Sequence, residues 1–154
     1  MNSYFLDPLS LDFWFRVGAT LICGGIIGLE RQLRGKPAGI RTSILICLGT
    51  QVFISLGMSL NDGDSARVLG QVVTGIGFIG AGVIMGKKNI VRGVTSAAII
   101  WVLAGIGAAI GLGYIATAVA LTLVTVLVLL GVEFLESSFR KLRRGVHAAS
   151  NQIN

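Results

Sequence analysis

The chain has 154 residues, of which 53% are hydrophobic and 13% are charged, and its formal net charge at pH 7 is +6. A soluble domain usually carries about a quarter of its residues as charged side chains, so this composition excludes an ordinary soluble protein and predicts one embedded in a lipid bilayer. The basic residues lie at the ends of apolar stretches and are not interleaved with aromatic residues, which argues against nucleic-acid binding.

Five apolar stretches follow one another along the chain. A helix needs about 20 predominantly apolar residues to cross a bilayer, and the stretches approach that length. They predict an all-α, integral membrane bundle of five transmembrane helices, over approximately residues 13–29, 42–60, 68–85, 94–110 and 114–134. Because the connections are short, successive helices are expected to be antiparallel neighbours.

The distribution of charge predicts an orientation. Basic residues gather in the connections after the first and third spans and again after the fifth span. Since cytoplasmic segments of membrane proteins are enriched in Lys and Arg, residues 1–12 are predicted to be extracytoplasmic and residues 135–154 to form a basic cytoplasmic tail. Apolar residues repeat in that tail at helical spacing, which fits either a helix on the membrane surface or an extension of the fifth helix.

The third span is rich in glycine. Its segment Gly75-Ile76-Gly77-Phe78-Ile79-Gly80 matches the dinucleotide-binding pattern, but it lies inside an apolar span and not between a strand and a helix. Small residues let membrane helices approach closely, so we interpret the glycines as packing positions that bring the first, third and fourth helices together. The positions are Gly24, Gly28, Gly75, Gly77, Gly80 and Gly82. A homo-oligomer built on such a face is an open alternative.

Few strongly polar side chains lie inside the predicted spans. Gln51 is the most central of them, and Gln71 and Thr74 lie nearer the outer side. Together with Asp64 and Arg67 they form a polar route if protomers assemble around it. The alternative is that the glutamines hydrogen-bond neighbouring helices.

No group of residues in the sequence indicates catalysis or a cofactor. Asp62 and Asp64 form a local acidic pair, but Asp64 is more simply explained as a cap of the third helix, and no metal site is predicted. Cys23 and Cys47 both fall inside predicted spans and are interpreted as buried packing residues, with a disulfide or metal pair as the alternative. The chain is therefore predicted not to be an enzyme.

Polar residues also gather where three spans meet the predicted cytoplasmic surface. Antiparallel packing is expected to bring them to one depth and to form an organised polar site, here called the rim, in which Glu30 pairs with Arg41 or Arg92. The alternative is ordinary anchoring of helix ends at the lipid headgroups. The rim consists of Glu30, Arg31, Gln32, Arg41, Thr42, Arg92, Thr95 and Ser96.

Several of these segments together resemble the MgtC/SapB family, over roughly residues 15 to 113. The resemblance rests on Gly28-Leu29-Glu30-Arg31-Gln32, Ala38-Gly39-Ile40-Arg41-Thr42, the glycine-rich stretch from Gln71 to Gly82, and Arg92-Gly93-Val94-Thr95-Ser96. It implies a multi-pass protein of the bacterial inner membrane. Two differences from the family pattern are a Thr at position 95 in place of the founding member's Asn, and an end before the soluble C-terminal domain of many members.

The resemblance implies two functions that remain alternatives at this stage. The first is a non-enzymatic regulator or stress-adaptation factor, linked to magnesium limitation and virulence and acting through other inner-membrane proteins, among them the ATP synthase or a membrane sensor. The second is a transporter or channel for magnesium or another small solute.

Overall fold

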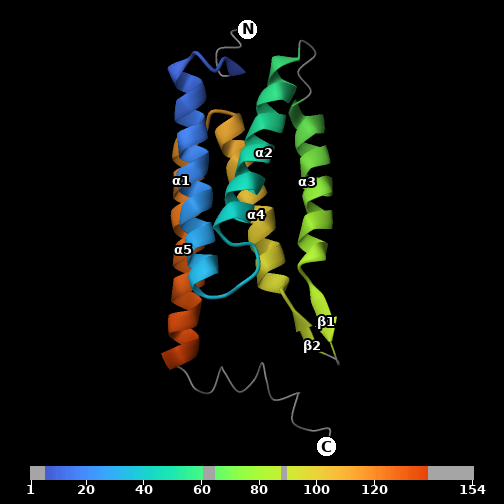
Figure 1. The fold of residues 1–154 in the computed structure, drawn as a ribbon, viewed down its shortest axis with the longest axis vertical. Coiled ribbons are helices and arrows are strands. Elements are labelled where there is room, and N and C mark those ends of the chain that lie inside the picture. Colours follow the sequence, from blue (N-terminus) through green and yellow to red (C-terminus); the bar gives the residue numbers. More distant parts are fainter. Residues whose placement is uncertain (1–5, 61–64, 88–89, 139–154) are drawn as a thin grey trace, which may run out of the picture.

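The computed structural model describes residues 6–60, 65–87 and 90–138 and contains five helices in this part of the chain (Figure 1). They are α1 (Leu11–Leu33), α2 (Ile40–Ser59), α3 (Ser65–Gly82), α4 (Val94–Gly111) and α5 (Ile115–Ser138). The predicted five-helix architecture is confirmed. Four of the helices, α1, α2, α4 and α5, are long and apolar enough to cross a membrane, whereas the apolar helix over Ala66–Gly82 is shorter.

A short β-hairpin joins α3 to α4, where the sequence predicted only a connection. Strands β1 (Met85–Lys87) and β2 (Ile90–Arg92) pair antiparallel, with Met85 opposite Arg92, and project beyond α3 and α4 at one end of the bundle (Figure 1). Gly93 then turns the chain into α4 with a φ of 93°, and a Cβ at this position would overlap the carbonyl oxygen of Val83. Only glycine fits both the backbone conformation and the space.

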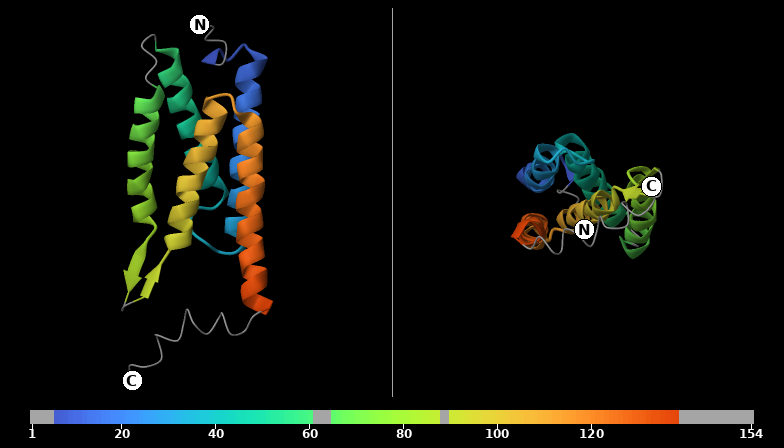
Figure 2. Two further views of the ribbon diagram at one scale, coloured as in Figure 1. Left: turned by 180° about the vertical axis from the view of Figure 1, so that it is seen from behind. Right: turned by 90° about the horizontal axis from the view of Figure 1, so that it is seen from below.

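Helix α4 lies between α3 and α5, which occupy opposite sides of the bundle (Figure 2). Its buried residues are almost all aliphatic or small, including Ile100, Leu103 and Ile106, and form the centre of the hydrophobic core. Cys23 and Cys47 are buried in the same core as free thiols, so the interpretation of both as packing residues is confirmed.

Helix α2 is held closely between α1 and α4 through glycines of those two helices. A Cβ on Gly28 of α1 would come within 2.6 Å of the Ile40 Cα, and a Cβ on Gly24 within 3.0 Å of the Ile44 Cα. From the other side, Gly107 meets the backbone of Cys47, and a Cβ on Gly111 would come within 2.8 Å of the Gln51 carbonyl oxygen. Helix α2 is therefore a central packing partner.

This arrangement corrects the expectation that glycines bring the first, third and fourth helices together. Helix α2 contributes Ser43, Cys47 and Thr50 to its buried face, and these side chains are small enough to admit the glycines of α1 and α4. A search restricted to glycine and alanine pairs overlooks a helix whose close contacts are made by serine, cysteine and threonine.

The glycines of α3 differ among themselves. A Cβ on Gly80 would lie 3.7 Å from Ala97 of α4, an ordinary contact distance, so Gly80 faces α4. By contrast, Gly75, Gly77 and Gly82 are exposed, and a Cβ added at any of them would meet nothing within 4 Å. These three do not pack against another described helix, contrary to the expectation from the sequence.

At the end of the bundle opposite the hairpin, Arg16 of α1 binds the last turn of α4. Its Nη1 donates to the carbonyl oxygens of Gly111 at 3.0 Å and Ile110 at 3.4 Å, and its Nε pairs with Asp12 at 2.9 Å. The last carbonyls of a helix lack intrahelical donors and carry a partial negative charge. Arg16 therefore stabilises the end of α4 and ties it to α1.

Replacing Arg16 with alanine is expected to lower the free energy of unfolding by about 1–2 kcal/mol, because the α4 carbonyls lose a charged donor. Unfolding in detergent micelles, followed by loss of helical circular dichroism, measures the effect. Lysine at this position keeps the charge and should restore part of the stability. Equal stability of the alanine variant and the natural chain would contradict a capping role.

Candidate functional site

The best-defined polar contact in the described chain joins the end of α1 to the start of α4. The buried residues of α1 recur every three or four positions, from Thr20 through Cys23 and Ile27, and Arg31 falls next on the same face. Arg31 is only 4% exposed, and its Nη2 donates to the Ser96 hydroxyl oxygen at 2.8 Å. The periodicity of α1 thus carries an arginine into the protein interior.

Glu30 extends this contact toward α5. Its Oε1 lies 2.5 Å from the Nε of Arg34, and its Oε2 lies 3.9 Å from the Nη1 of Arg31. Arg34 also forms an ion pair with Glu133 of α5. Two carboxylates and two guanidinium groups therefore balance one another and connect α1 to both α4 and α5; we call Glu30, Arg31, Arg34, Ser96 and Glu133 the ionic cluster.

Two buried polar atoms of the ionic cluster have hydrogen-bonding capacity to spare. Glu30 Oε2 and Arg31 Nε have no hydrogen-bond partner among the described residues. A buried polar group without a hydrogen-bond partner lowers the stability of the folded protein. Here the neighbouring Arg34, Ser96 and Glu133, which are all hydrogen-bonded or ion-paired, offset this loss. The ionic cluster is therefore a structural link between helices that retains one acceptor and one donor.

The ionic cluster differs from the rim expected from the sequence. Glu30 pairs with Arg34 and not with Arg41 or Arg92, because α1 continues to Leu33 and places Arg34 one turn after Glu30. An i, i+4 search of this segment would have found the Glu30–Arg34 pair. Glu133 has no such local signal, since only the packing of α5 against α1 brings it near.

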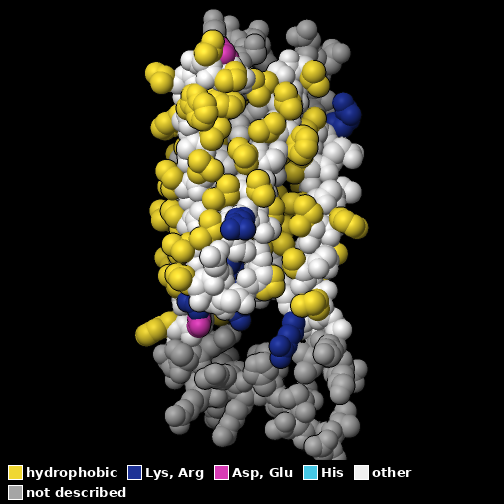
Figure 3. All heavy atoms as spheres, in the orientation of Figure 1, with side chains coloured by type: hydrophobic (Ala, Val, Ile, Leu, Met, Phe, Trp, Pro, Cys, Tyr) yellow, Lys and Arg dark blue, Asp and Glu magenta, His cyan; other side chains and the backbone are white. Residues whose placement is uncertain are grey.

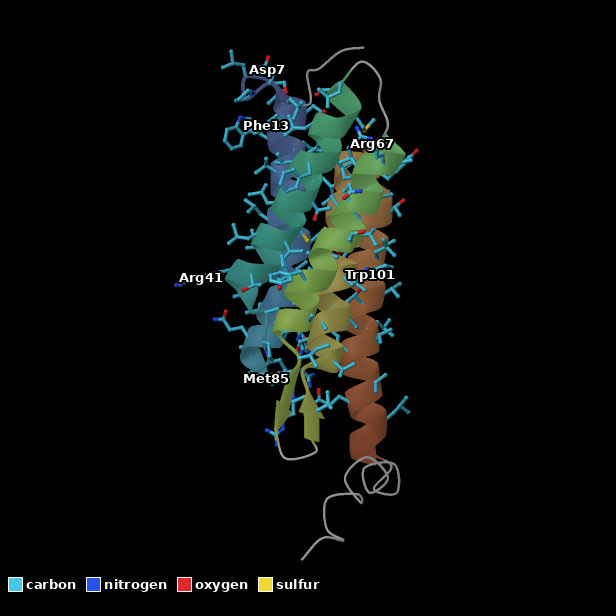
Figure 4. The ribbon with its side chains drawn as sticks, turned by 90° about the vertical axis from the view of Figure 1, so that its right-hand side faces the viewer. Asp7, Phe13, Arg41, Arg67, Met85 and Trp101 are labelled. Carbon is cyan, nitrogen blue, oxygen red and sulfur yellow. The ribbon has the colours of Figure 1, made fainter. Side chains whose placement is uncertain are left out.

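The other members of the expected rim lie elsewhere. Gln32 approaches the start of α2, where its Oε1 accepts from the Ile40 backbone N–H at 3.4 Å. Arg41, Thr42, Arg92 and Thr95 are exposed. In Figure 4, Arg41 projects outward from the bundle, on the side away from Trp101.

The residues of the expected polar route do not line one path. Gln51 is 1% exposed and sits in the interior, where its Nε2 donates to Ser55 at 3.4 Å and Ser55 donates to the Gly111 carbonyl oxygen at 3.4 Å. Thr74 is exposed and its hydroxyl donates to the Gly70 carbonyl oxygen of its own helix at 3.0 Å. Arg67 is exposed near the start of α3, and Asp64 and Asp62 lie outside the described residues.

Gln71 instead faces a lateral groove between α2 and α3. The groove has a volume of about 660 Å³, in the range of about 300–1,000 Å³ that ligand sites occupy. All of its lining residues except Thr42, Thr50 and Gln71 are apolar or glycine. The lining comprises Thr42, Leu45, Ile46, Gly49, Thr50, Phe53, Val68, Gln71, Val72, Gly75, Ile76 and Ile79.

Comparison with known proteins assigns the chain to a family. The model of the MgtC family matches residues 17–138, which include the ionic cluster and the groove. The chain belongs to the MgtC family. The MgtC family is not a known enzyme class. The four long apolar helices of this chain and its membrane-protein relatives indicate that it is a membrane protein.

Three relatives illustrate the similarity. MgtC of Salmonella typhimurium is 44% identical over 106 residues, which are 69% of this chain and 46% of that protein. YhiD of Escherichia coli (strain K12) is 37% identical over 155 residues, covering 95% of this chain and 71% of YhiD. SapB of Bacillus subtilis is 38% identical over 150 residues, covering 91% of this chain and 62% of SapB.

The chain spans about half the length of the MgtC proteins that it matches. No solved structure gives a significant match.

Proposed function

We propose that this chain is a non-enzymatic regulator in a bacterial inner membrane, linked to adaptation to magnesium limitation, that acts by lateral contact with other membrane proteins. The observation that carries the proposal is the unoccupied small-residue face of α3. By family resemblance, the ATP synthase or a membrane sensor is a candidate partner, and a second copy of the chain is another.

The face consists of Gly70, Thr74, Gly77 and Ala81, all of them exposed. Their spacing of four, three and four residues places them on one side of the helix. A Cβ at Gly70 or Gly77 would meet nothing within 4 Å. Small side chains in this pattern allow another membrane helix to approach closely, and α3 is at the edge of the bundle, where such a helix has access (Figure 2).

The orientation proposed is N-terminus outside and C-terminus in the cytoplasm, with α3 as a fifth span. Figure 4 shows Asp7 and Arg67 toward one end of the bundle and Met85 toward the other, with Arg41 between them at the height of Trp101. The end near Met85 carries Arg34, Lys36 and Arg92, and hydrophobic side chains cover most of the face between the ends (Figure 3). This charge distribution supports the proposed orientation.

Transport is the competing function. It is favoured by the name of one relative, "Putative magnesium transporter YhiD", and by the presence of Gln71 in the groove. The described interior argues for regulation instead, because its one buried charged residue, Arg31, is tied to Ser96 and Glu30 at one end of the bundle. A cation path normally presents ionisable or oxygen-rich groups deep in the membrane.

The regulatory proposal is tested by complementation: a bacterial strain that lacks the gene for this chain is grown in low magnesium, and the chain or a variant is supplied. The variant Gly77→Leu should insert and fold but fail to restore growth, because the leucine blocks close approach of a partner helix. Gly105→Leu is the matched control, since Gly105 is also exposed and open but lies on α4. Full complementation by Gly77→Leu at normal protein abundance would refute a role for the α3 face.

A further inference from the structure

We infer that Arg41 binds the phosphate group of a phospholipid and draws it toward the middle of the bundle, so that the membrane is thinner beside the start of α2 than beside α5. The inference rests on the depth of Arg41 in the bundle, on its exposure without a partner, and on the connection that precedes it. It is independent of the proposed regulation.

Contacts between helices fix the depth of Arg41. Helix α2 begins beside Gly28, because a Cβ on that glycine would come within 2.6 Å of the Ile40 Cα. Arg34, which pairs with Glu133, follows Gly28 by six residues, a distance of about 9 Å at helical rise. The start of α2 therefore lies well inside the bundle, measured from the end that carries the Arg34–Glu133 ion pair.

The neighbouring helices are apolar on their exposed sides at this depth. Figure 4 shows Arg41 at the height of Trp101, which lies seven residues past Val94, the start of α4, or about 10 Å. On α5, Leu127 lies six residues before Glu133, and the exposed large side chains around it are aliphatic. Arg41 therefore lies at the depth of side chains that face hydrocarbon.

Arg41 has no partner within the described chain. It is exposed, and its side chain forms no ion pair or hydrogen bond with a described residue. Charged residues in membrane spans normally face the interior and pair there. The described acids of a second copy do not supply a partner, because Glu30 and Glu133 are paired and Asp7 and Asp12 lie toward the opposite end.

The connection between α1 and α2 also needs polar surroundings. Residues 34–39 are not helical, and in Figure 1 they turn back from the end of α1 toward the middle of the bundle, where α2 begins. Gly35, Lys36 and Pro37 are exposed. Non-helical backbone is not exposed to hydrocarbon in membrane proteins. Headgroups and water are therefore expected to reach this connection.

Phosphate is the anion that every phospholipid brings to this depth when the leaflet thins. A guanidinium group matches phosphate through two parallel hydrogen bonds. Reorientation of a long basic side chain toward the headgroups, together with local thinning of the bilayer, lowers the cost of a cation in the membrane. Arg41 projects outward from the bundle (Figure 4), so the phosphate has to approach the side chain.

Thiol labelling of the full chain in phospholipid vesicles tests the inference. A thiol reacts as the thiolate, so its rate with a small charged methanethiosulfonate, present on both sides of the membrane, reports hydration. Thr42→Cys should react at least about tenfold faster than Leu127→Cys, although Leu127 is nearer its end of the bundle. The natural chain is the blank, because Cys23 and Cys47 are buried.

The arginine and the phosphate are then removed in turn. Arg41→Leu should bring the Thr42→Cys rate to within about twofold of the Leu127→Cys rate, whereas Arg41→Lys, which keeps a cation on a long stem, should retain most of it. Vesicles of diglucosyl diacylglycerol, which has no phosphate, should lower the rate as Arg41→Leu does. Arg92→Gln, an exposed cation on the hairpin, should leave it within about twofold. Elution as a single species checks the folding of each variant.

Three outcomes would overturn the inference. Equal rates at positions 42 and 127 in phospholipid vesicles would mean that hydrocarbon reaches the start of α2. A fast Thr42→Cys rate that persists with Arg41→Leu, or without phosphate, would mean that the arginine does not hold a phosphate there. Slow labelling of the purified chain, combined with failure of Arg41→Leu to complement in cells, would assign the arginine to an acidic side chain of a partner protein.

Discussion

Replacing Arg31 with alanine is expected to lower the free energy of unfolding by about 3 kcal/mol, because it removes one partner of a buried charged pair. The guanidinium is almost fully buried, donates to Ser96 and lies beside the inner carboxylate oxygen of Glu30. Without it, the Ser96 hydroxyl and Glu30 Oε2 are left in a low-dielectric interior. Unfolding by denaturant in detergent micelles, followed by circular dichroism, measures the loss.

A double-mutant cycle between Arg31 and Ser96 separates their contact from general destabilisation. Ser96→Ala should cost about 1–3 kcal/mol by leaving a buried charged donor without its acceptor, and the double variant should cost clearly less than the two single changes combined. Thr95→Ala is the matched control, because Thr95 is adjacent but exposed. Additive effects, or a Thr95→Ala loss as large as that of Ser96→Ala, would contradict the contact.

Leucine at Gly107 should prevent α2 and α4 from packing together, with a loss of about 3 kcal/mol or more, at the upper end of the range for overpacked cores. A Cβ alone at Gly107 would overlap the carbonyl oxygen of Cys47 and lie 3.0 Å from the Thr50 Cβ. Backbone atoms cannot move aside as a flexible side chain can. The expected signs are broad or aggregated elution in detergent and a lower thermal midpoint.

The neighbouring glycine provides the control for that experiment. Gly105 is on the same helix, is exposed and has nothing within 4 Å of a Cβ position. Gly105→Leu should therefore elute and unfold as the natural chain does. If both leucine variants behave alike, the close contact between α2 and α4 is wrong.

The helices could be predicted from the sequence because length and hydropathy decide which segments cross a bilayer. Which helices pack against one another could not be predicted, because the helices of a membrane protein are nearly equally apolar on all sides. Gly24 and Gly28 were recognisable as close-contact positions, but their partner is α2, whose small polar residues carry no distinctive pattern. Gly75 and Gly77 look equivalent to them in sequence and are open in the fold.

The candidate site was predictable to the extent that its contacts are local. Arg31 and Ser96 both belonged to the expected rim, and the structure brings them together. The Glu30–Arg34 pair required knowing that α1 runs four residues past the expected end of the first span, and Glu133 required the position of α5. The groove depends on the tilt between α2 and α3, which no residue pattern encodes by itself.

The claim that this chain regulates and does not transport is tested most directly by magnesium flux. Purified full-length chain is reconstituted into sealed liposomes that contain a magnesium-sensitive dye, and an inward magnesium gradient is imposed with and without a membrane potential. The expected result is a rate of dye response equal to that of protein-free liposomes. Magnesium entry above that rate, reduced by Gln71→Leu and unaffected by Gly105→Leu, would contradict the regulatory account and establish transport through the groove side of α3.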